Sequence, residues 1–209
     1  MATTRQKAAG ATRLSYHHGD LPRAMVREAV RIIQKQGVGA LTLRTVGEHL
    51  GVSRTALYRH FANKDALLGA VADEGFRTLR QELLAAWETG GGGRAGFNGM
   101  GLAYVRFAVT HTSHYRVMFG GFVRPDRPKI DRESTDAFGP LVQAIEAQQQ
   151  EGLIRGDASQ ALASYIWAVV HGVAMLAVDG IITDRAAVES LAHFALERLW
   201  TGIGASPRD

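Results

Sequence analysis

The stretch that decides the fold is Thr42–Leu68, TLRTVGEHLGVSRTALYRHFANKDALL, which reads as two short helices joined by a glycine turn. Leu43, Val46 and Leu50 are spaced three and four residues apart, which predicts the apolar face of a short helix, with Thr42 as its N-cap. Gly51 suits the left-handed residue that ends such a helix, because glycine has no Cβ to make that conformation costly. A second short helix is therefore expected directly after the turn.

The residues after the turn predict that second helix and the start of a third. Ser53 is a good N-cap, and Asn63 caps again before Asp65, whose charge suits the first turn of a helix. Between the caps, Ala56, Leu57 and Phe61 are expected to pack inward, leaving Arg54, Thr55, Tyr58 and Arg59 facing out. This pattern is typical of the helix-turn-helix, whose second helix lies in the DNA major groove.

The same stretch closely resembles the DNA-binding signature of the TetR family of bacterial transcriptional regulators. The residues that carry this resemblance are Gly51-Val52-Ser53, Tyr58, His60-Phe61, Lys64 and Leu67. The match covers roughly the first third of the chain, and the resemblance implies a DNA-binding regulator.

The charge distribution favours the same interpretation. Residues 1–64 carry 11 Lys and Arg against 3 Asp and Glu, whereas the rest of the chain carries 13 against 17. A basic module joined to a mildly acidic one predicts that the first part meets a polyanion. The absence of cysteine excludes disulfides and thiolate metal sites and favours the cytoplasm, and the N-terminus has no apolar signal core.

The expected fold class is all-α, with about nine helices and no strand-like alternation. We expect a flexible basic arm over 1–19, a three-helix DNA-binding domain over 20–64, a larger helical regulatory and dimerisation domain over 65–204, and a tail over 205–209. The basic arm could reach phosphates or a minor groove, or be a solvated tail. Asp20 is expected to cap the first helix and Gly37 to end it.

Beyond the third helix start, the pattern predicts one long helix from Asn63 to about Trp87. The run Thr89–Gly99, TGGGGRAGFNG, is predicted to be a flexible loop. Further helices are expected over 100–110, 115–119, 130–151, 158–179 and 184–203, with a loop over 120–129. The apolar stretch 158–178 approaches membrane-spanning length but contains Gln160, Ser164 and His171, so a buried helix is expected.

The second half also resembles one group of TetR-type C-terminal domains, through Trp167 to His171-Gly172 and through His114–Phe119. The resemblance implies dimerisation through the last two helices and an effector held between the others. The small residues of 158–178 would also let a partner helix approach closely, although an intramolecular core would use them equally well.

Two sets of site residues are predicted. The DNA contacts are divided between phosphate-contacting residues that set the register and residues placed to read base edges, with Tyr58 suited to both roles and His60 able to pack on the next helix instead. The first group is Thr42, Arg44, Ser53, Tyr58, His60 and Lys64, and the second is Arg54, Thr55, Ala56 and Arg59. The candidates for an effector pocket are Phe76, Leu79, Leu83, Met100, Tyr104, Phe107, Met118, Phe119, Phe122, Trp167, His171 and Met175. Among them, Tyr104, Trp167 and His171 would supply the polar groups that orient a ligand. For each candidate, core packing is the alternative role.

The sequence predicts no enzyme, cofactor or metal ion. It has no Cys nucleophile, no glycine-rich phosphate loop and no G-x-S-x-G elbow, and His111 with His114 lacks an evident third metal ligand. We expect a homodimeric repressor, released from a palindromic double-stranded DNA operator when a small apolar or aromatic effector binds. The alternatives are a constitutive DNA-binding regulator without effector, and a small-molecule-binding or catalytic helical protein.

Overall fold

The computed structural model describes residues 20–122 and 136–204, and within these ranges the chain is helical. Its single pairing of β type there is an isolated bridge between Ile154 and Gly204. The described elements are α1 (Leu21–Gln36), the 3-10 turn η1 (Val38–Ala40), α2 (Leu43–Leu50), α3 (Arg54–His60), α4 (Lys64–Thr89), α5 (Gly93–Thr110), α6 (Thr112–Phe119), α8 (Gly139–Gln150), α9 (Ser159–Val178) and α10 (Arg185–Ile203). The all-α prediction is confirmed.

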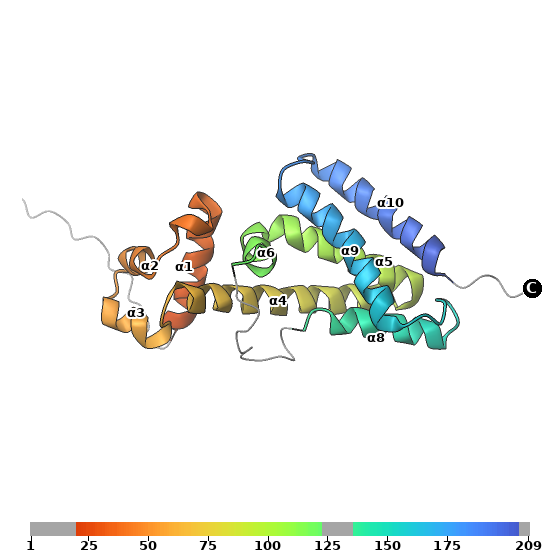
Figure 1. The fold of residues 1–209 in the computed structure, drawn as a ribbon, viewed down its shortest axis with the longest axis horizontal. Coiled ribbons are helices and arrows are strands. Elements are labelled where there is room, and N and C mark those ends of the chain that lie inside the picture. Colours follow the sequence, from red (N-terminus) through yellow and green to blue (C-terminus); the bar gives the residue numbers. More distant parts are fainter. Residues whose placement is uncertain (1–19, 123–135, 205–209) are drawn as a thin grey trace, which may run out of the picture.

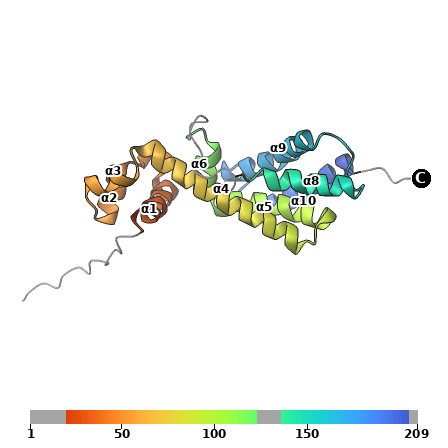
Figure 2. The same cartoon turned by 90° about the horizontal axis from the view of Figure 1, so that it is seen from below.

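The helices form a small head and a larger body, joined by α4 (Figures 1 and 2). The head consists of α1, α2 and α3 together with the start of α4. The body contains the rest of α4 with α5, α6, α8, α9 and α10. Because one uninterrupted helix of 26 residues belongs to both, the two parts share a buried core rather than a flexible linker.

The first helix ends as predicted but begins differently. Gly37 has a φ of 79° and donates its N–H to the carbonyl of Ile33, which closes α1. The prediction that the Asp20 side chain caps α1 is wrong, because it makes no capping hydrogen bond. Its carboxylate lies 3.7 Å from both Arg23 and Arg27 instead, so these guanidinium groups compete for it.

The predicted glycine-rich loop after α4 is largely helical. Only a short turn separates Thr89 from Gly93, and α5 includes residues 93–99. A Cβ on Gly96 would lie 2.9 Å from the Trp87 ring and 3.1 Å from the Trp87 carbonyl oxygen. The missing side chain therefore allows α5 to pack directly on α4, and this contact outweighs the poor helix propensity of glycine.

Two further boundaries differ from the sequence-based prediction. The helix expected over 130–151 begins only at Gly139, after Asp136 accepts hydrogen bonds from the N–H groups of Phe138 and Gly139. Residues 130–135, the basic arm and most of the loop over 120–129 lie outside the described residues. The short helix expected at Tyr115 begins three residues earlier, at Thr112, immediately after the predicted break.

Helix α9 is the one described helix with the length and mean hydropathy, 1.8, to cross a membrane by composition alone. It packs against α5, α8 and α10, and Leu162, Ile166 and Val170 are buried in the core. These contacts agree with the expected role as a core helix. Its remaining face is exposed in the single chain, where Tyr165 and Leu176 are 54% and 39% accessible.

Candidate nucleic-acid interface and internal cavity

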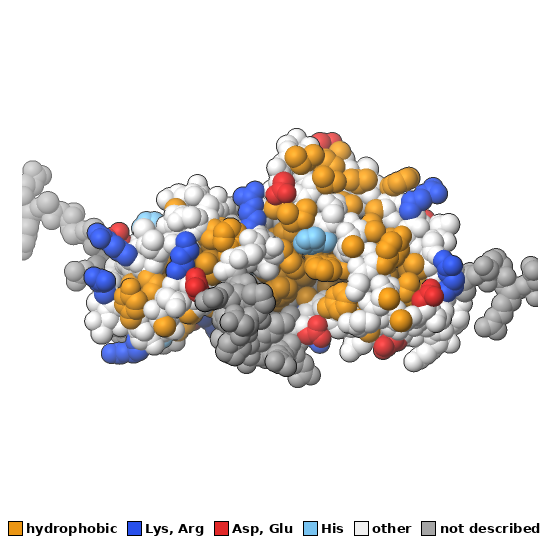
Figure 3. All heavy atoms as spheres, in the orientation of Figure 1, with side chains coloured by type: hydrophobic (Ala, Val, Ile, Leu, Met, Phe, Trp, Pro, Cys, Tyr) orange, Lys and Arg blue, Asp and Glu red, His pale blue; other side chains and the backbone are white. Residues whose placement is uncertain are grey.

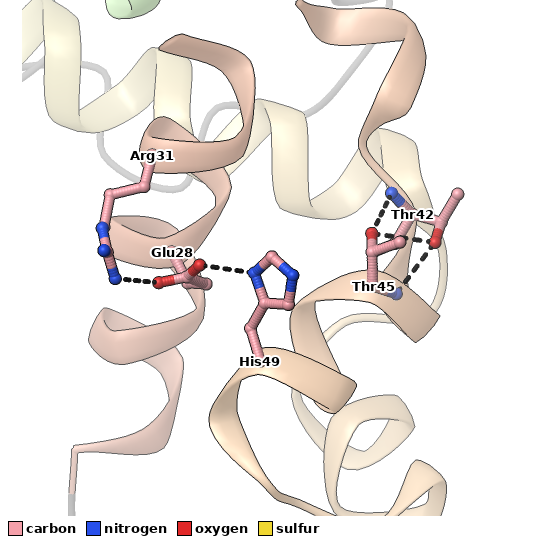
Figure 4. A network of polar contacts seen from close by, with 5 residues as sticks. All are labelled: Glu28, Arg31, Thr42, Thr45 and His49. Atoms are coloured by element: carbon pink, nitrogen blue, oxygen red, sulfur yellow. Dashed lines mark hydrogen bonds and ion pairs between the residues drawn. The ribbon is translucent and has the colours of Figure 1, made fainter. Parts of the chain in front are cut away.

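The helix-turn-helix is held by local hydrogen bonds that the sequence predicted. The Thr42 hydroxyl accepts the N–H of Thr45 at 3.0 Å, and the Thr45 hydroxyl accepts the N–H of Thr42 at the same distance (Figure 4). Gly51 adopts the left-handed conformation, with a φ of 66°, and Ser53 Oγ accepts the N–H of Ala56 at 3.3 Å. Each short helix therefore begins at a satisfied cap, which fixes the angle between α2 and α3.

Helix α3 presents a polar face to solvent. Leu57 is 1% exposed and anchors the helix on the core, while Ala56 is half-buried. The exposed residues are Arg54, Thr55, Tyr58, Arg59 and His60, with Tyr58 51% accessible. Lys and Arg side chains lie around this end of the molecule in Figure 3. An exposed, basic helix held by one buried anchor is what entry into a groove of DNA requires.

The remaining candidates for DNA contact have partners within the protein. Arg44 Nε donates to Glu48 at 2.7 Å, and this hydrogen bond raises the pKa of Arg44. The ammonium of Lys64 donates to the carbonyl oxygen of Val38 at 2.8 Å, so it ties the start of α4 to η1. The hydroxyls of Thr42 and Ser53 serve as caps.

A buried carboxylate in the head escaped the sequence analysis. Glu28 on α1 is 7% exposed and accepts hydrogen bonds from Arg31 at 3.0 Å, while His49 Nδ1 on α2 lies 2.8 Å from its other oxygen (Figure 4). A usable signal was present, because Glu28 interrupts the apolar stripe formed by Met25, Ala29 and Ile32. The contact fixes α1 against the end of α2, next to the Gly51 turn.

The body contains a cavity of about 380 Å³ between α4, α5, α8, α9 and α10. Seven predicted pocket residues line it, namely Phe76, Leu79, Leu83, Met100, Tyr104, Phe119 and Trp167. The sequence analysis missed Phe97, Gly101, Asp136, Ala137, Phe138, Leu141, Ser164, Ile166, Val170 and Leu196. Its volume falls within the range of small-molecule sites.

The other five candidates do not border this cavity. Phe107 and Met118 are core residues, 1% and 9% exposed. Phe122 and Met175 line a separate cavity of about 300 Å³, between the α1–η1 turn of the head and helices α6 and α9. His171 lies behind the wall of the larger cavity, where its Nδ1 contacts the hydroxyl of the lining residue Tyr104.

His171 belongs to a cluster of four polar side chains, of which Tyr104 and Trp167 line the cavity and Tyr115 and His171 lie behind them. His171 Nδ1 lies 2.9 Å from the Tyr104 hydroxyl and 2.7 Å from the Tyr115 hydroxyl, and the two hydroxyls are 3.3 Å apart. Trp167 Nε1 donates to the Tyr104 oxygen at 2.9 Å. Burial raises the pKa of Tyr104 to about 12, raises that of Tyr115 and lowers the pKa of His171. All four side chains are therefore uncharged at neutral pH.

His111, between α5 and α6, and His114 on α6 both pair with carboxylates of α4. His111 Nε2 lies 3.4 Å from Glu82, and His114 Nε2 lies 3.3 Å from Glu74, whose pKa is lowered chiefly by this hydrogen bond. No group of three or more potential metal ligands occurs among the residues that the structure describes. The fold and these two regions define a helix-turn-helix DNA-binding protein with a hollow helical body.

Comparison with known proteins identifies the family within this class of DNA-binding proteins. Residues 26–71 match the family model described as bacterial regulatory proteins, tetR family, and residues 97–199 match the model described as tetracyclin repressor-like, C-terminal domain. The tetracycline repressor protein class A from transposon 1721 of Escherichia coli is 46% identical over 52 residues. The match covers 25% of this chain and 24% of the repressor's own length, and so is confined to about a quarter of each.

Solved structures extend the similarity over the whole body. A Rhodococcus sp. RHA1 protein of unknown function is 32% identical, with a TM-score of 0.80 over 91% of this chain and 98% of its own. A tetR-family regulatory protein from Rhodococcus RHA1 shares the fold, with 19% identity and a TM-score of 0.68 over 88% of this chain and 97% of its own. The chain belongs to the TetR family of DNA-binding transcriptional regulators. Members of this family are soluble proteins that bind DNA operators, dimerise and bind small-molecule effectors, and the family is not an enzyme class.

Proposed function

We propose that this protein is a cytoplasmic repressor whose dimer leaves a palindromic operator when a small molecule enters the 380 Å³ cavity. Residues 20–64 form the DNA-binding domain in this proposal, and residues 65–204 form the regulatory and dimerisation domain. The observation that supports the proposal is that α4 belongs to both the DNA-binding domain and the regulatory domain. Phe76, Leu79 and Leu83 on α4 line the cavity, and Lys64 at the start of α4 is tied to the head.

The exposed face of α3 is assigned to the major groove. We assign base-edge contacts to Arg54, Thr55, Ala56 and Arg59, because Arg donates two hydrogen bonds to guanine and Ala contacts a thymine methyl. Tyr58 and His60 suit phosphate contacts, since both are exposed beside this face. The caps Thr42 and Ser53, and also Arg44, are assigned to phosphates, and Lys64 reaches a phosphate only with donors not used by Val38.

The DNA assignment is tested with an operator enriched from random duplexes. The expected sequence is a palindrome with half-sites about 34–36 Å apart. Arg59→Ala should reduce operator affinity by about 5- to 150-fold while leaving affinity for unrelated DNA within about twofold, because a bidentate contact to guanine contributes about 1–3 kcal/mol. Arg44→Ala is the matched control, and it should weaken binding to all DNA. The slope of the logarithm of the binding constant against the logarithm of the salt concentration should become shallower by about 0.9. Equal losses on both kinds of DNA for Arg59→Ala would overturn the base-reading assignment.

The dimer is assigned to α9 and α10. Support comes from Tyr165 and Leu176 on α9 and Phe194 on α10, which are 54%, 39% and 59% accessible in the single chain although they are large and apolar. Gly172 on α9 is also exposed, and a Cβ there would meet nothing within 4 Å in the single chain. An uncovered apolar face of this kind indicates a protein partner. A two-fold axis would place it against its own copy.

The dimer is tested by mass measurement in solution. Phe194→Asp should convert a dimer into a folded monomer, because the charge is harmless in solvent and costly in an apolar interface. Ile181→Asp, which alters an exposed residue in the turn after α9, is the control and should remain dimeric. A Phe194→Asp protein that stays dimeric would place the interface elsewhere.

Effector release requires that the small molecule and the operator weaken each other's binding. A ligand that binds two conformations equally shifts nothing, and the coupling is reciprocal. The measurement is the effector's dissociation constant with and without saturating operator, which should differ by about 5- to 150-fold. If the two dissociation constants were equal, a constitutive regulator would be the better interpretation. The cavity favours the regulated form, since a constitutive body has no use for an empty volume that costs packing contacts.

A further inference from the structure

Among the described residues that line the 380 Å³ cavity, six are aromatic and most polar groups have a hydrogen-bond partner. Six lining residues carry aromatic rings: Phe76, Phe97, Tyr104, Phe119, Phe138 and Trp167. The Ser164 hydroxyl donates to the carbonyl of Gln160 at 2.9 Å, and the Trp167 N–H donates to Tyr104. The Asp136 carboxylate accepts two N–H groups at the start of α8, where the helix dipole favours a negative charge.

The exception is the proton of the Tyr104 hydroxyl. Tyr104 is 5% exposed and borders the cavity. Both tyrosine hydroxyls approach the same nitrogen, His171 Nδ1, which has one lone pair in its neutral acceptor form. Because its contact is the shorter one, at 2.7 Å, the Tyr115 hydroxyl donates to that lone pair. The acceptor that remains for the Tyr104 proton is Tyr115 Oη, at 3.3 Å. This distance exceeds the usual range for O–H···O hydrogen bonds.

The other histidine tautomer leads to the same conclusion. If His171 Nδ1 carries the proton, it donates to a tyrosine oxygen, and the cluster has one acceptor fewer. The two hydroxyl protons then have only each other's oxygens, across 3.3 Å. In both tautomers a buried donor beside the cavity lacks a good acceptor, and such a donor is costly unless a bound molecule satisfies it.

We propose, on the premise that this cavity is the effector site, that its ligand is an uncharged, largely aromatic or alicyclic molecule whose carbonyl or ether oxygen accepts the Tyr104 hydroxyl proton. Among the described residues that line the cavity none is basic, and the one acidic group is Asp136, whose Oδ1 accepts two N–H groups at the start of α8, so these residues do not compensate the desolvation of a charged ligand. A cavity of 150 Å³ holds benzene, so about 380 Å³ corresponds to roughly 15 non-hydrogen atoms.

The test compares four bicyclic probes of one shape: tetralin, 1-tetralone, 1-aminotetralin and 1,2,3,4-tetrahydronaphthalene-1-carboxylate. Dissociation constants are measured by calorimetry on the full-length dimer at pH 7. The ketone should bind about fivefold more tightly than the hydrocarbon, which is the effect of one net hydrogen bond. The ammonium and carboxylate probes should bind at least about tenfold more weakly than the ketone, because the cavity does not compensate their desolvation.

Two substitutions outside the cavity surface should affect this preference differently. Tyr115→Phe removes the competitor for the His171 lone pair, so the Tyr104 proton turns to His171 and the ketone preference falls to about one. His171→Phe removes the lone pair, so the preference is kept or increased. Ser164→Ala, whose hydroxyl is already used, should leave the ratio unchanged. Tetralin binding and thermal unfolding report whether each variant has folded.

The outcomes separate this inference from the function on which it rests. Equal binding of ketone and hydrocarbon, tighter binding of a charged probe, or a preference unaffected by Tyr115→Phe would overturn the ligand class while leaving effector binding intact. If none of the four probes binds at millimolar concentration, the cavity is not an effector site for molecules of this size, and both proposals fail.

Discussion

Replacing Gly75 with alanine should destabilise the protein, although alanine is the better helix former. Gly75 lies in α4 where α6 crosses it. An added Cβ would be 2.4 Å from Met118 Sδ, 3.2 Å from Met118 Cγ and 3.1 Å from His114 Cβ. These distances are below normal van der Waals contact, so α6 or the Met118 side chain must move. His114 gives way least, because the contacted atom is the first carbon of its side chain.

The two opposing contributions have known sizes. Helix propensity favours alanine by about 1 kcal/mol, and overpacking of a core costs about 1–3 kcal/mol. The free energy of unfolding should therefore fall by about 1 kcal/mol, which lowers the melting temperature by about 2–4 °C for a chain of this size. The measurement is urea unfolding at equal protein concentrations, since dimerisation makes stability depend on concentration.

A matched control isolates the crossing. A Cβ on Gly39 in η1, away from α9 and α10, would meet nothing within 4 Å, so Gly39→Ala should be neutral or stabilising by up to about 1 kcal/mol. In the double variant Gly75→Ala with Met118→Ala, the steric cost should be relieved, giving a favourable coupling of at least about 0.5 kcal/mol. A gain in stability for Gly75→Ala alone, or strict additivity, would refute the close crossing of α4 and α6.

Three other perturbations test the head and the polar cluster. His49→Leu leaves the buried Glu28 carboxylate without one partner and should cost about 1–3 kcal/mol in urea unfolding. Arg44→Ala breaks only an exposed ion pair and should leave the free energy of unfolding nearly unchanged. Leu57→Ala empties the anchor of α3 and should cost about 2–5 kcal/mol, detected as faster hydrogen exchange in α2 and α3. Burial lowers the pKa of His171, so the unfolded chain binds a proton more readily than the folded protein, and the free energy of unfolding decreases as the pH falls below about 6.5. His171→Phe should flatten this part of the plot of stability against pH. An unchanged plot would count against a buried neutral imidazole.

The helix-turn-helix could be predicted from sequence because its structure is local. The caps at Thr42, Ser53 and Asn63 and the left-handed Gly51 act within three or four residues, and all four are observed. The cavity depends on contacts between distant segments. Phe97 was assigned to a loop because its glycine neighbours weaken a helix in isolation, and the packing of α5 on Trp87 that overrides this preference is invisible in a linear pattern.

The polar cluster shows the same limit at the level of single atoms. Tyr104, Trp167 and His171 were predicted to supply polar groups, and two of them line the cavity. The third acts through Tyr115, which no periodicity distinguishes from other core aromatics. Which tyrosine hydroxyl donates to the lone pair of His171 Nδ1 depends on a difference of 0.2 Å between the two oxygen–nitrogen distances. Only the packed structure contains that information.

The unbroken length of α4 makes it a lever arm. At 1.5 Å per residue, the cavity residue Phe76 lies about 18 Å along the axis from Lys64. A tilt of about 5° at the cavity would therefore displace the DNA-proximal end by roughly 1.6 Å, and in opposite directions in the two halves of a symmetric dimer. Hydrogen bonds to phosphate tolerate only a few tenths of an ångström. In the proposed mechanism, a molecule of roughly 15 atoms therefore needs to do little more than widen its own cavity to put both recognition helices out of register.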